Sequence, residues 1–421
     1  MSHHVVPALW RHAWRAAGIL ILAWPAGAGA QGLTFDRALA LAGENAASLV
    51  ARQAALDSAA AASKSAGELP DPQLSIGLEN LPIEGADRFS LSRDPMTMSR
   101  IGVMQDVPNA AKRQARVETA NARVSRERAQ FALERVAVQR DTANAWIARY
   151  TLEQRLAAID ALDGELRLQQ QTINAEVTSG RRSAADALMI RQEAALVEER
   201  RDELARDIVK ATATLRRFIG PDAVAPLAGD LPRLPVESHA LHERLDRHLE
   251  LIASIAEIDV ARGELREAQA AKRPDWAWEV AYQKRAPAFG DMVSVQVRIE
   301  LPFLQERRQE PRVLARQKEV TRLEAELENM RRRHVEELDG MLAEREELTR
   351  RVERLHKVSL ALADQRVQLQ LASYGAGKVD LGAVLSARRD LVETRLKTLE
   401  AEAQLAAAEA KLAYFIAEER P

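Results

Sequence analysis

The chain has 421 residues, of which 29% are charged and only 4% are aromatic, and its formal net charge at pH 7 is −2. Such a composition is typical of long helices that pack along narrow apolar seams, and it argues against two or three globular domains. The interspersed charges exclude a basic surface for nucleic acid, and the lack of cysteine excludes disulfides, thiolate metal sites and a lipid-acceptor cysteine.

Residues 1–30 have the pattern of a secretory signal peptide. The stretch MSHHVVPALWRHAWR is basic, AAGILILAW is apolar but too short to cross a bilayer, and the small residues Ala28–Ala30 fit a cleavage site. An uncleaved anchor is the alternative interpretation. The sequence therefore predicts an exported chain that begins near Gln31 and carries no lipid.

The first half of the mature chain, residues 31–219, is predicted to contain helices on either side of two strands. Its segments are an opening helix at about 33–66, a strand pair at 73–81 and 99–107, a long helix at 109–178 and a closing helix at 183–219. Pro70 and Pro72 end the opening helix, and alternation of apolar and polar residues marks the strands. The long helix contains no proline, and at about 1.5 Å per residue it would extend roughly 105 Å.

Residues 220–235 are rich in proline and glycine and are predicted to form a linker or small equatorial segment. The second half, residues 236–421, repeats the order of the first. Its segments are an opening helix, a strand pair at 275–283 and 293–301, a long helix at 303–374 and a closing helix at 380–418. Five identical pairs lie 197 positions apart, namely Gly180 and Gly377, Leu188 and Leu385, Arg191 and Arg388, Phe218 and Phe415, and Ile219 and Ile416. The sequence therefore predicts two internal structural repeats.

The four predicted strands are about nine residues long, which is the length of a tilted strand that crosses a bilayer. Two separate hairpins cannot form a stable sheet alone, and four strands are too few to close a membrane barrel, so several chains are expected to pool their strands. Polar side chains would then line a wet lumen and apolar side chains would face lipid. The lumen set is Glu79, Glu279, Arg298 and Glu300, and the lipid set is Trp276, Trp278, Tyr282, Val295 and Val297. A soluble sheet with one wet face is the alternative.

Two segments carry a resemblance to a known family. They are NLPIEGADRFSLSRDPMTMSRIGVMQDVPNAAKR, which starts at Asn80, and SYGAGKVDLGAVLSARRDLVETRLKTLEAEAQL, which starts at Ser373. Together with the order of the elements, they resemble the TolC-type outer-membrane efflux proteins, and most of all the heavy-metal (CzcC-like) branch. The resemblance covers essentially the whole mature chain. It implies a homotrimer in which each chain gives four strands to a twelve-stranded β-barrel in the outer membrane of a Gram-negative bacterium, continued by an α-helical barrel in the periplasm.

The resemblance also implies partners and a function. Such channels dock on a periplasmic adaptor protein and an inner-membrane RND exporter that supplies the energy, so the chain would be a passive exit duct and not an enzyme. The implied cargo is heavy-metal cations, and an efflux duct for drugs or other small molecules or a type I secretion channel are alternatives. A periplasmic coiled-coil adaptor is a further alternative, but an adaptor normally has one helical hairpin, and two are predicted here.

The resemblance places the channel entrance and the adaptor contact at the tips of the two predicted hairpins. The tip residues are Gly180, Arg181, Arg182, Asp186, Tyr374, Gly377, Lys378 and Asp380. Tyr374 matches the family's gate tyrosine, and Asp186 matches its acidic residue. Other charged positions of the family are occupied here by Val379, Ala383 and Ser386. An ordinary capped helix turn with a solvated acid is the alternative interpretation of Asp186.

No metal site and no cofactor are predicted. The residues weighed as ligands are Met96, Met98, Met104, His239, His242 and His248. The methionines fit packing or loop positions, and no carboxylate lies at matching spacing to the three histidines. His334 lies in an apolar heptad phase and is interpreted as a seam residue without companion ligands. No catalytic triad, phosphate loop or paired-carboxylate signature is found, so no enzymatic activity is predicted.

Overall fold

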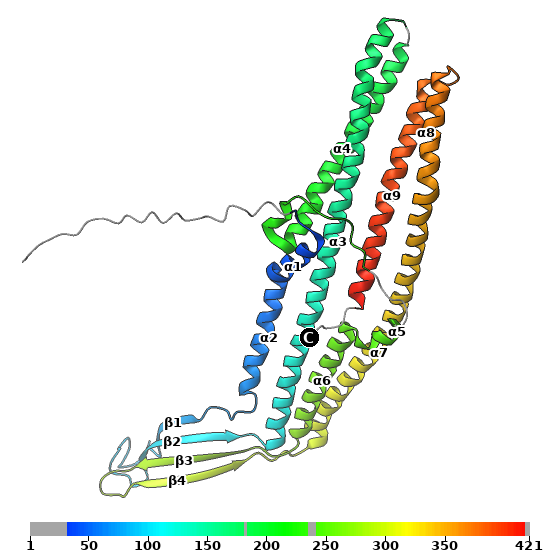
Figure 1. The fold of residues 1–421 in the computed structure, drawn as a ribbon. Helices are drawn as coiled ribbons and strands as arrows, with labels where there is room; N and C mark the ends of the chain where they lie inside the picture. Colours follow the sequence, from blue (N-terminus) through cyan, green and yellow to red (C-terminus); the bar gives the residue numbers. More distant parts are fainter. Residues whose placement is uncertain (1–31, 181–182, 235–240, 417–421) are drawn as a thin grey trace, which may run out of the picture.

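The computed structural model describes residues 32–180, 183–234 and 241–416. The predicted signal peptide, the tip residues Arg181 and Arg182, and His239 lie outside this part of the chain. The described residues form an elongated bundle of helices, with a small sheet at one end and two helical hairpins at the other (Figure 1). The structure is mostly helical, as the composition predicts.

The first half begins with two short helices where one opening helix was expected. Its elements are α1 (Phe35–Asn45), α2 (Ala47–Ser65), β1 (Gln73–Glu79), β2 (Met98–Val107), α3 (Ala110–Thr178), α4 (Ala184–Ile219) and the 3-10 turn η1 (Gly220–Val224). The break lies at Ala46, whose backbone is extended with φ −67° and ψ 114°. Ala46 is buried, so the break turns α1 onto the core beside α3. Helix α3 has 69 residues and is therefore about 100 Å long.

The second half has the same general course. Its elements are α5 (Leu241–Arg244), the 3-10 turn η2 (Leu245–Arg247), α6 (Leu249–Ala270), β3 (Trp276–Lys284), β4 (Met292–Ile299), α7 (Gln305–Arg354), the π-helical turn η3 (Leu355–Ser359), α8 (Leu360–Gly375) and α9 (Leu381–Phe415). The segment expected as one long helix at 303–374 is α7 and α8 joined through the π-helical turn. Such a turn inserts an extra residue into the helix without ending it.

The four strands form one antiparallel sheet in the order β1-β2-β3-β4. The strand pairs of the two halves are joined within one chain, because β2 pairs with β3. The register is regular. It places Ile76, Ile101, Tyr282 and Val293 side by side in one row across all four strands. Because side chains alternate between faces along a strand, this register separates an apolar face from a polar face.

The core at the middle of the bundle surrounds Trp146, whose side chain is fully buried. Its indole Nε1 donates a hydrogen bond to the backbone carbonyl oxygen of Leu33 at 3.1 Å, and its ring stacks on Tyr150. Leu33 also pairs with Leu227 in a parallel β-bridge. The segment expected to be a linker is therefore packed onto α1 and α3.

Candidate functional site

One face of the sheet carries apolar side chains that are solvent-exposed in the single chain. They are Leu74, Ile76, Leu78, Ile101, Val103, Trp276, Val280, Tyr282, Val293, Val295, Val297 and Ile299, with Trp278 half-buried among them. The register confirms that the five side chains predicted to lie on one face do so. They are Trp276, Trp278, Tyr282, Val295 and Val297. Val295, in the middle of β4, is 71% exposed. Apolar patches of this extent mark surfaces that another molecule or a membrane covers.

The opposite face of the sheet carries a cluster of charges around Arg100. Its guanidinium contacts the carboxylate of Glu79 at 2.7 Å and also the carboxylate of Glu279. Arg298 lies on this face too, because it pairs in register with Ala277 on β3. Glu300 follows the end of β4 and is not part of the strand. Arg100 could not be predicted from the sequence, because its contact with Glu279 depends on the pairing of β2 with β3.

Asp275 holds the junction between the sheet and the bundle. Its Oδ1 accepts hydrogen bonds from the backbone N–H and the side-chain amide of Asn109, both at 2.8 Å, and its Oδ2 accepts one from Lys112 Nζ at 2.7 Å. Burial alone would raise the pKa of Asp275, but these hydrogen bonds and the Lys112 charge outweigh it and lower the pKa below its usual value. The carboxylate therefore ties the start of β3 to the start of α3.

We expect Asp275→Asn to lower the free energy of unfolding by about 1–3 kcal/mol at neutral pH, because Lys112 loses its charged partner. The pKa of Asp275 is lower in the folded chain than in the unfolded chain. Its stabilisation is therefore present above the unfolded value of about 3.9 and is lost as the pH falls below that value toward the folded pKa. Thermal unfolding followed by circular dichroism should show the two proteins converging in acid.

The control for this experiment is Asp71→Asn. Asp71 follows Pro70 in the first half, as Asp275 follows Pro274 in the second, but Asp71 is exposed. The Asp71→Asn protein should unfold with the wild-type midpoint. A wild-type midpoint for Asp275→Asn at neutral pH would show that the junction does not depend on this carboxylate.

The turn between α3 and α4 is a capped helix reversal. Gly180 has φ +69°, a left-handed conformation that costs glycine little. The hydroxyl of Ser183 accepts a hydrogen bond from the backbone N–H of Asp186 at 3.2 Å, and the carboxylate of Asp186 accepts one from the N–H of Ser183 at 3.2 Å. This reciprocal capping box gives Asp186 a structural role whether or not it also acts in a gate.

The turn between α8 and α9 also contains a left-handed glycine. Gly377 also has φ +69°, and the backbone N–H of Lys378 donates to the carbonyl oxygen of Ser373 at 2.9 Å. Asp380 caps α9 by accepting a hydrogen bond from the N–H of Ala383 at 2.9 Å. Both tips therefore use a left-handed glycine followed by an oxygen-bearing cap.

Side chains near the two tips pack together. Tyr374 from α8 is partly buried against an apolar cluster that contains Ile190 from α4 and Leu381 from α9. Further from the tips, Arg389 Nε on α9 donates to the Glu193 carboxylate on α4 at 2.9 Å. The two helical hairpins turn at the same end of the bundle (Figure 1). Asp186 near the start of α4, Tyr374 at the end of α8 and Asp380 just before α9 therefore lie at that end.

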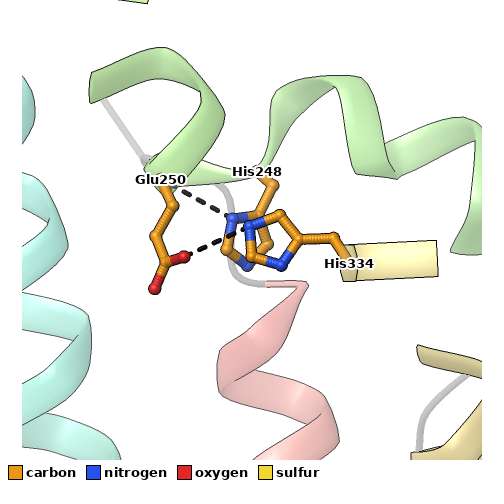
Figure 2. A group of neighbouring side chains, drawn as sticks. All are labelled: His248, Glu250 and His334. Atoms are coloured by element: carbon orange, nitrogen blue, oxygen red, sulfur yellow. Dashed lines mark hydrogen bonds and ion pairs between the residues drawn. The ribbon is translucent and has the colours of Figure 1, made fainter. Parts of the chain in front are cut away.

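Two histidines come together where α6 begins. His334 is buried in the seam, as its heptad phase predicts, but it is not isolated there, because His248 and Glu250 lie beside it. His248 caps α6, with its Nδ1 accepting the backbone N–H of Glu250 at 3.2 Å. His334 on α7 lies against it, with the ring centroids 4.1 Å apart (Figure 2). Burial, and to a lesser extent repulsion from His334, lowers the pKa of His248 to about 4, so this imidazole is neutral at neutral pH. His242 does not join them and pairs instead with Asp339 at 2.9 Å.

The sequence matches no protein-family model and no curated protein. Solved structures match its fold. A membrane protein from Pseudomonas aeruginosa superposes with a TM-score of 0.79 at 14% identity, over 91% of this chain and 90% of that one. The CmeC outer membrane channel of Campylobacter jejuni superposes with a TM-score of 0.77 at 11% identity, over 91% of this chain and 85% of that one. The outer membrane protein VceC of Vibrio cholerae superposes with a TM-score of 0.75 at 16% identity, over 91% of this chain and 96% of that one.

The chain, whose long helices carry a small antiparallel sheet, therefore has the fold of known outer-membrane channels. At these identities the likeness is one of fold, and it extends along nearly the whole chain. Within the described ranges, no helix combines the length and the apolar character that a bilayer crossing requires.

Proposed function

We propose that the chain is one protomer of a trimeric exit duct in the outer membrane of a Gram-negative bacterium. Three chains would each contribute β1 to β4 to a twelve-stranded barrel, and the two repeats of long helices would continue the duct into the periplasm. The exported chain would begin near Gln31. The observation that carries the proposal is the exposed apolar face of the sheet, which the lipid of the membrane would cover.

The open edges of the sheet support an assembly of several chains. In the single chain, β1 and β4 are each paired on one side only. Unpaired strand edges are costly within a membrane, and pairing β4 of one chain with β1 of the next would satisfy both. The face with Glu79, Glu279 and Arg298 would then line the wet lumen, with Glu300 at its rim.

Paired cysteines test this assembly, because the chain contains no cysteine of its own. One cysteine replaces Ser75 on β1, and the second replaces Ser294, Gln296 or Arg298 on β4 in turn, all on the polar face. Within one chain β1 and β4 are three strand spacings apart, about 14 Å, which is too far for a disulfide. Any bond must therefore join two chains.

We expect one of these pairs to form a disulfide-linked product that stops at three chains. Variants with a single cysteine are the controls and should give nothing larger than a dimer. A protein that is a monomer in mild detergent, with no cross-link from any of the pairs, would contradict the trimer.

The duct would be passive, performing no chemistry itself. An inner-membrane RND exporter would supply the energy, and a periplasmic adaptor protein would dock on the hairpin tips. The likeness in fold to outer-membrane channels supports this general role.

We infer heavy-metal cations as the cargo from the resemblance of residues 80–113 and 373–405 to the CzcC-like branch. A strain that lacks the gene should become more sensitive to metal salts than to dyes, and the reverse pattern would favour drugs or other small molecules.

We further propose that the charge of Asp186 sets the ion preference of the duct entrance, which the tips with Tyr374 and Lys378 would form. Two variants separate this role from capping. Asp186→Asn removes the charge but keeps an oxygen that can accept the Ser183 N–H, whereas Ser183→Ala removes half of the capping box and keeps the charge. In planar bilayers we expect Asp186→Asn to lower the preference of single channels for cations. Ser183→Ala should cost about 0.5–2 kcal/mol of stability and leave that preference unchanged. If neither variant changes ion preference, Asp186 is a cap alone.

A further inference from the structure

Three potential metal ligands gather at the end of α6 that is opposite the sheet. His248 is the N-cap residue of α6, Glu250 lies in the first turn of that helix, and His334 lies on α7. Phe415, the last residue of α9, packs against both imidazoles with ring centroids 4.6 and 5.4 Å away. Figure 2 shows the two imidazole rings against each other, with the Glu250 carboxylate pointing to a nitrogen of His334. The cluster thus joins α6 and α7 beside the end of α9.

The ligand atoms are close enough to share one ion. One nitrogen from each histidine and one carboxylate oxygen of Glu250 all lie within 4.8 Å of one another. His334 Nε2 is 3.2 Å from Glu250 Oε2. Two ligands of a tetrahedral zinc ion, with bonds of about 2.0 Å, lie about 3.3 Å apart. One of the distances already fits, and the others need small side-chain movements.

The burial of His334 is an independent indication of a ligand. His334 is only 3% exposed. Although Glu250 Oε2 lies 3.2 Å from Nε2, neither ring nitrogen of His334 makes a contact with the geometry of a hydrogen bond within the described part of the chain. Buried polar atoms without partners are rare because they lose their water without compensation. An ion bound at Nε2 would remove this defect. Glu337, whose Oε2 is 3.9 Å from Nδ1, lies where a carboxylate can accept the remaining N–H of a metal-bound imidazole.

We propose that His248, Glu250 and His334 bind a divalent transition-metal ion such as Zn²⁺ through two imidazole nitrogens and one carboxylate oxygen. This set of ligands suits zinc and its first-row neighbours, whereas Ca²⁺ and Mg²⁺ prefer oxygen ligands throughout. A cavity of about 320 Å³ adjoins His248 and Glu250 and is also lined by Glu337 and Lys411. It leaves room for a water molecule as the fourth ligand.

Binding would change the start of α6. In the ion-free chain, His248 Nδ1 accepts a hydrogen bond from the backbone N–H of Glu250. A metal ion bound to Nδ1 would occupy the lone pair that accepts this hydrogen bond. A metal ion bound to Nε2 would require the imidazole proton to be on Nδ1, which could then no longer accept. Either mode removes this cap, which limits the affinity of the site. In exchange the ion clamps α6 to α7. The site is independent of the cargo proposed above, because its ligands lie on α7 and at the start of α6 and are not part of the sheet or the hairpin tips.

Direct metal binding to the full-length protein tests this inference. Tag-free protein in detergent is stripped with EDTA and titrated with Zn²⁺ by calorimetry and with Co²⁺ by visible absorption. We expect one ion per chain, Co²⁺ bands typical of a low coordination number, and a higher midpoint of thermal unfolding when Zn²⁺ is present.

Variants of the ligands decide whether the ion sits at this cluster. Glu250→Gln and His334→Gln should each weaken binding by roughly tenfold or more and abolish the thermal shift. Glu250 is half-exposed, so Glu250→Gln is expected to fold even if His334→Gln does not. His242→Gln, at an exposed histidine, is the matched control and should bind as the wild type does. Absence of a stoichiometric ion, or equal binding by Glu250→Gln and wild type, would overturn the proposal.

Discussion

Replacing Trp146 by alanine is expected to lower the free energy of unfolding by about 3–5 kcal/mol, the range for removing a large aromatic side chain from a packed core. Trp146 is completely buried, with Phe35 edge-on at 5.6 Å and Tyr150 stacked at 5.1 Å between ring centroids. The cavity would lie where α1, α3 and the segment after η1 meet. Thermal or denaturant unfolding in detergent, followed by circular dichroism, measures the loss.

Trp146→Phe is the matched control for the loss of volume. It keeps an aromatic ring but removes the indole N–H that donates to the Leu33 carbonyl oxygen. That oxygen retains a hydrogen bond from the backbone N–H of Ala228 at 3.2 Å, so it is not left without a partner. Trp146→Phe is therefore expected to lower the free energy of unfolding by only about 1 kcal/mol through the lost hydrogen bond, plus a small amount through the lost packing contacts of the indole. Equal stability of the alanine variant and the wild type would mean that this core contributes little.

The common face of Trp276, Trp278 and Tyr282 could be predicted from the sequence because it depends on local geometry alone. Neighbouring side chains of any strand point to opposite faces, whatever the strand pairs with. Long helices are similarly predictable where proline is absent, as in α3. The break at Ala46 could not be predicted, because no proline lies near it and the nearby glycine, Gly43, is inside α1. The position of the break depends on the burial of α1 against α3.

Two clusters could not be predicted because they join residues that are distant in the sequence. Arg100 reaches Glu279 only because β2 of the first half pairs with β3 of the second. His248 reaches His334 only because α6 packs along α7. Hydrophobic periodicity identifies which face of an element is buried, but it does not specify which residue of another element lies opposite. Spacing rules for metal ligands fail for the same reason when the ligands lie on different helices.

The apolar face of the sheet allows a prediction that tests its place in a membrane. Val295 lies in the middle of β4, in register with Val280 on β3, and it belongs to a row that continues to Val103 and Leu74. If this face meets lipid, Val295→Arg should cost about 2–4 kcal/mol in each chain near the bilayer midplane. Since three chains would carry the change, assembled trimer in the outer-membrane fraction should fall sharply. Heat-modifiable migration on gels of that fraction gives the measurement.

Gln296→Arg is the matched control, since it introduces the same charge one residue away on the opposite face. Gln296 pairs in register with Glu279, so the new guanidinium would have a carboxylate beside it and, on the proposed assembly, water around it. We expect Gln296→Arg to assemble as the wild type does. A soluble sheet with this face in water would not discriminate in this way, because an arginine at an exposed position costs little in water. Equal amounts of the two variants in the outer membrane would therefore exclude a lipid-facing role for this face. Selective loss of the Val295→Arg protein is the result expected if Val295 faces lipid and Gln296 faces the wet lumen.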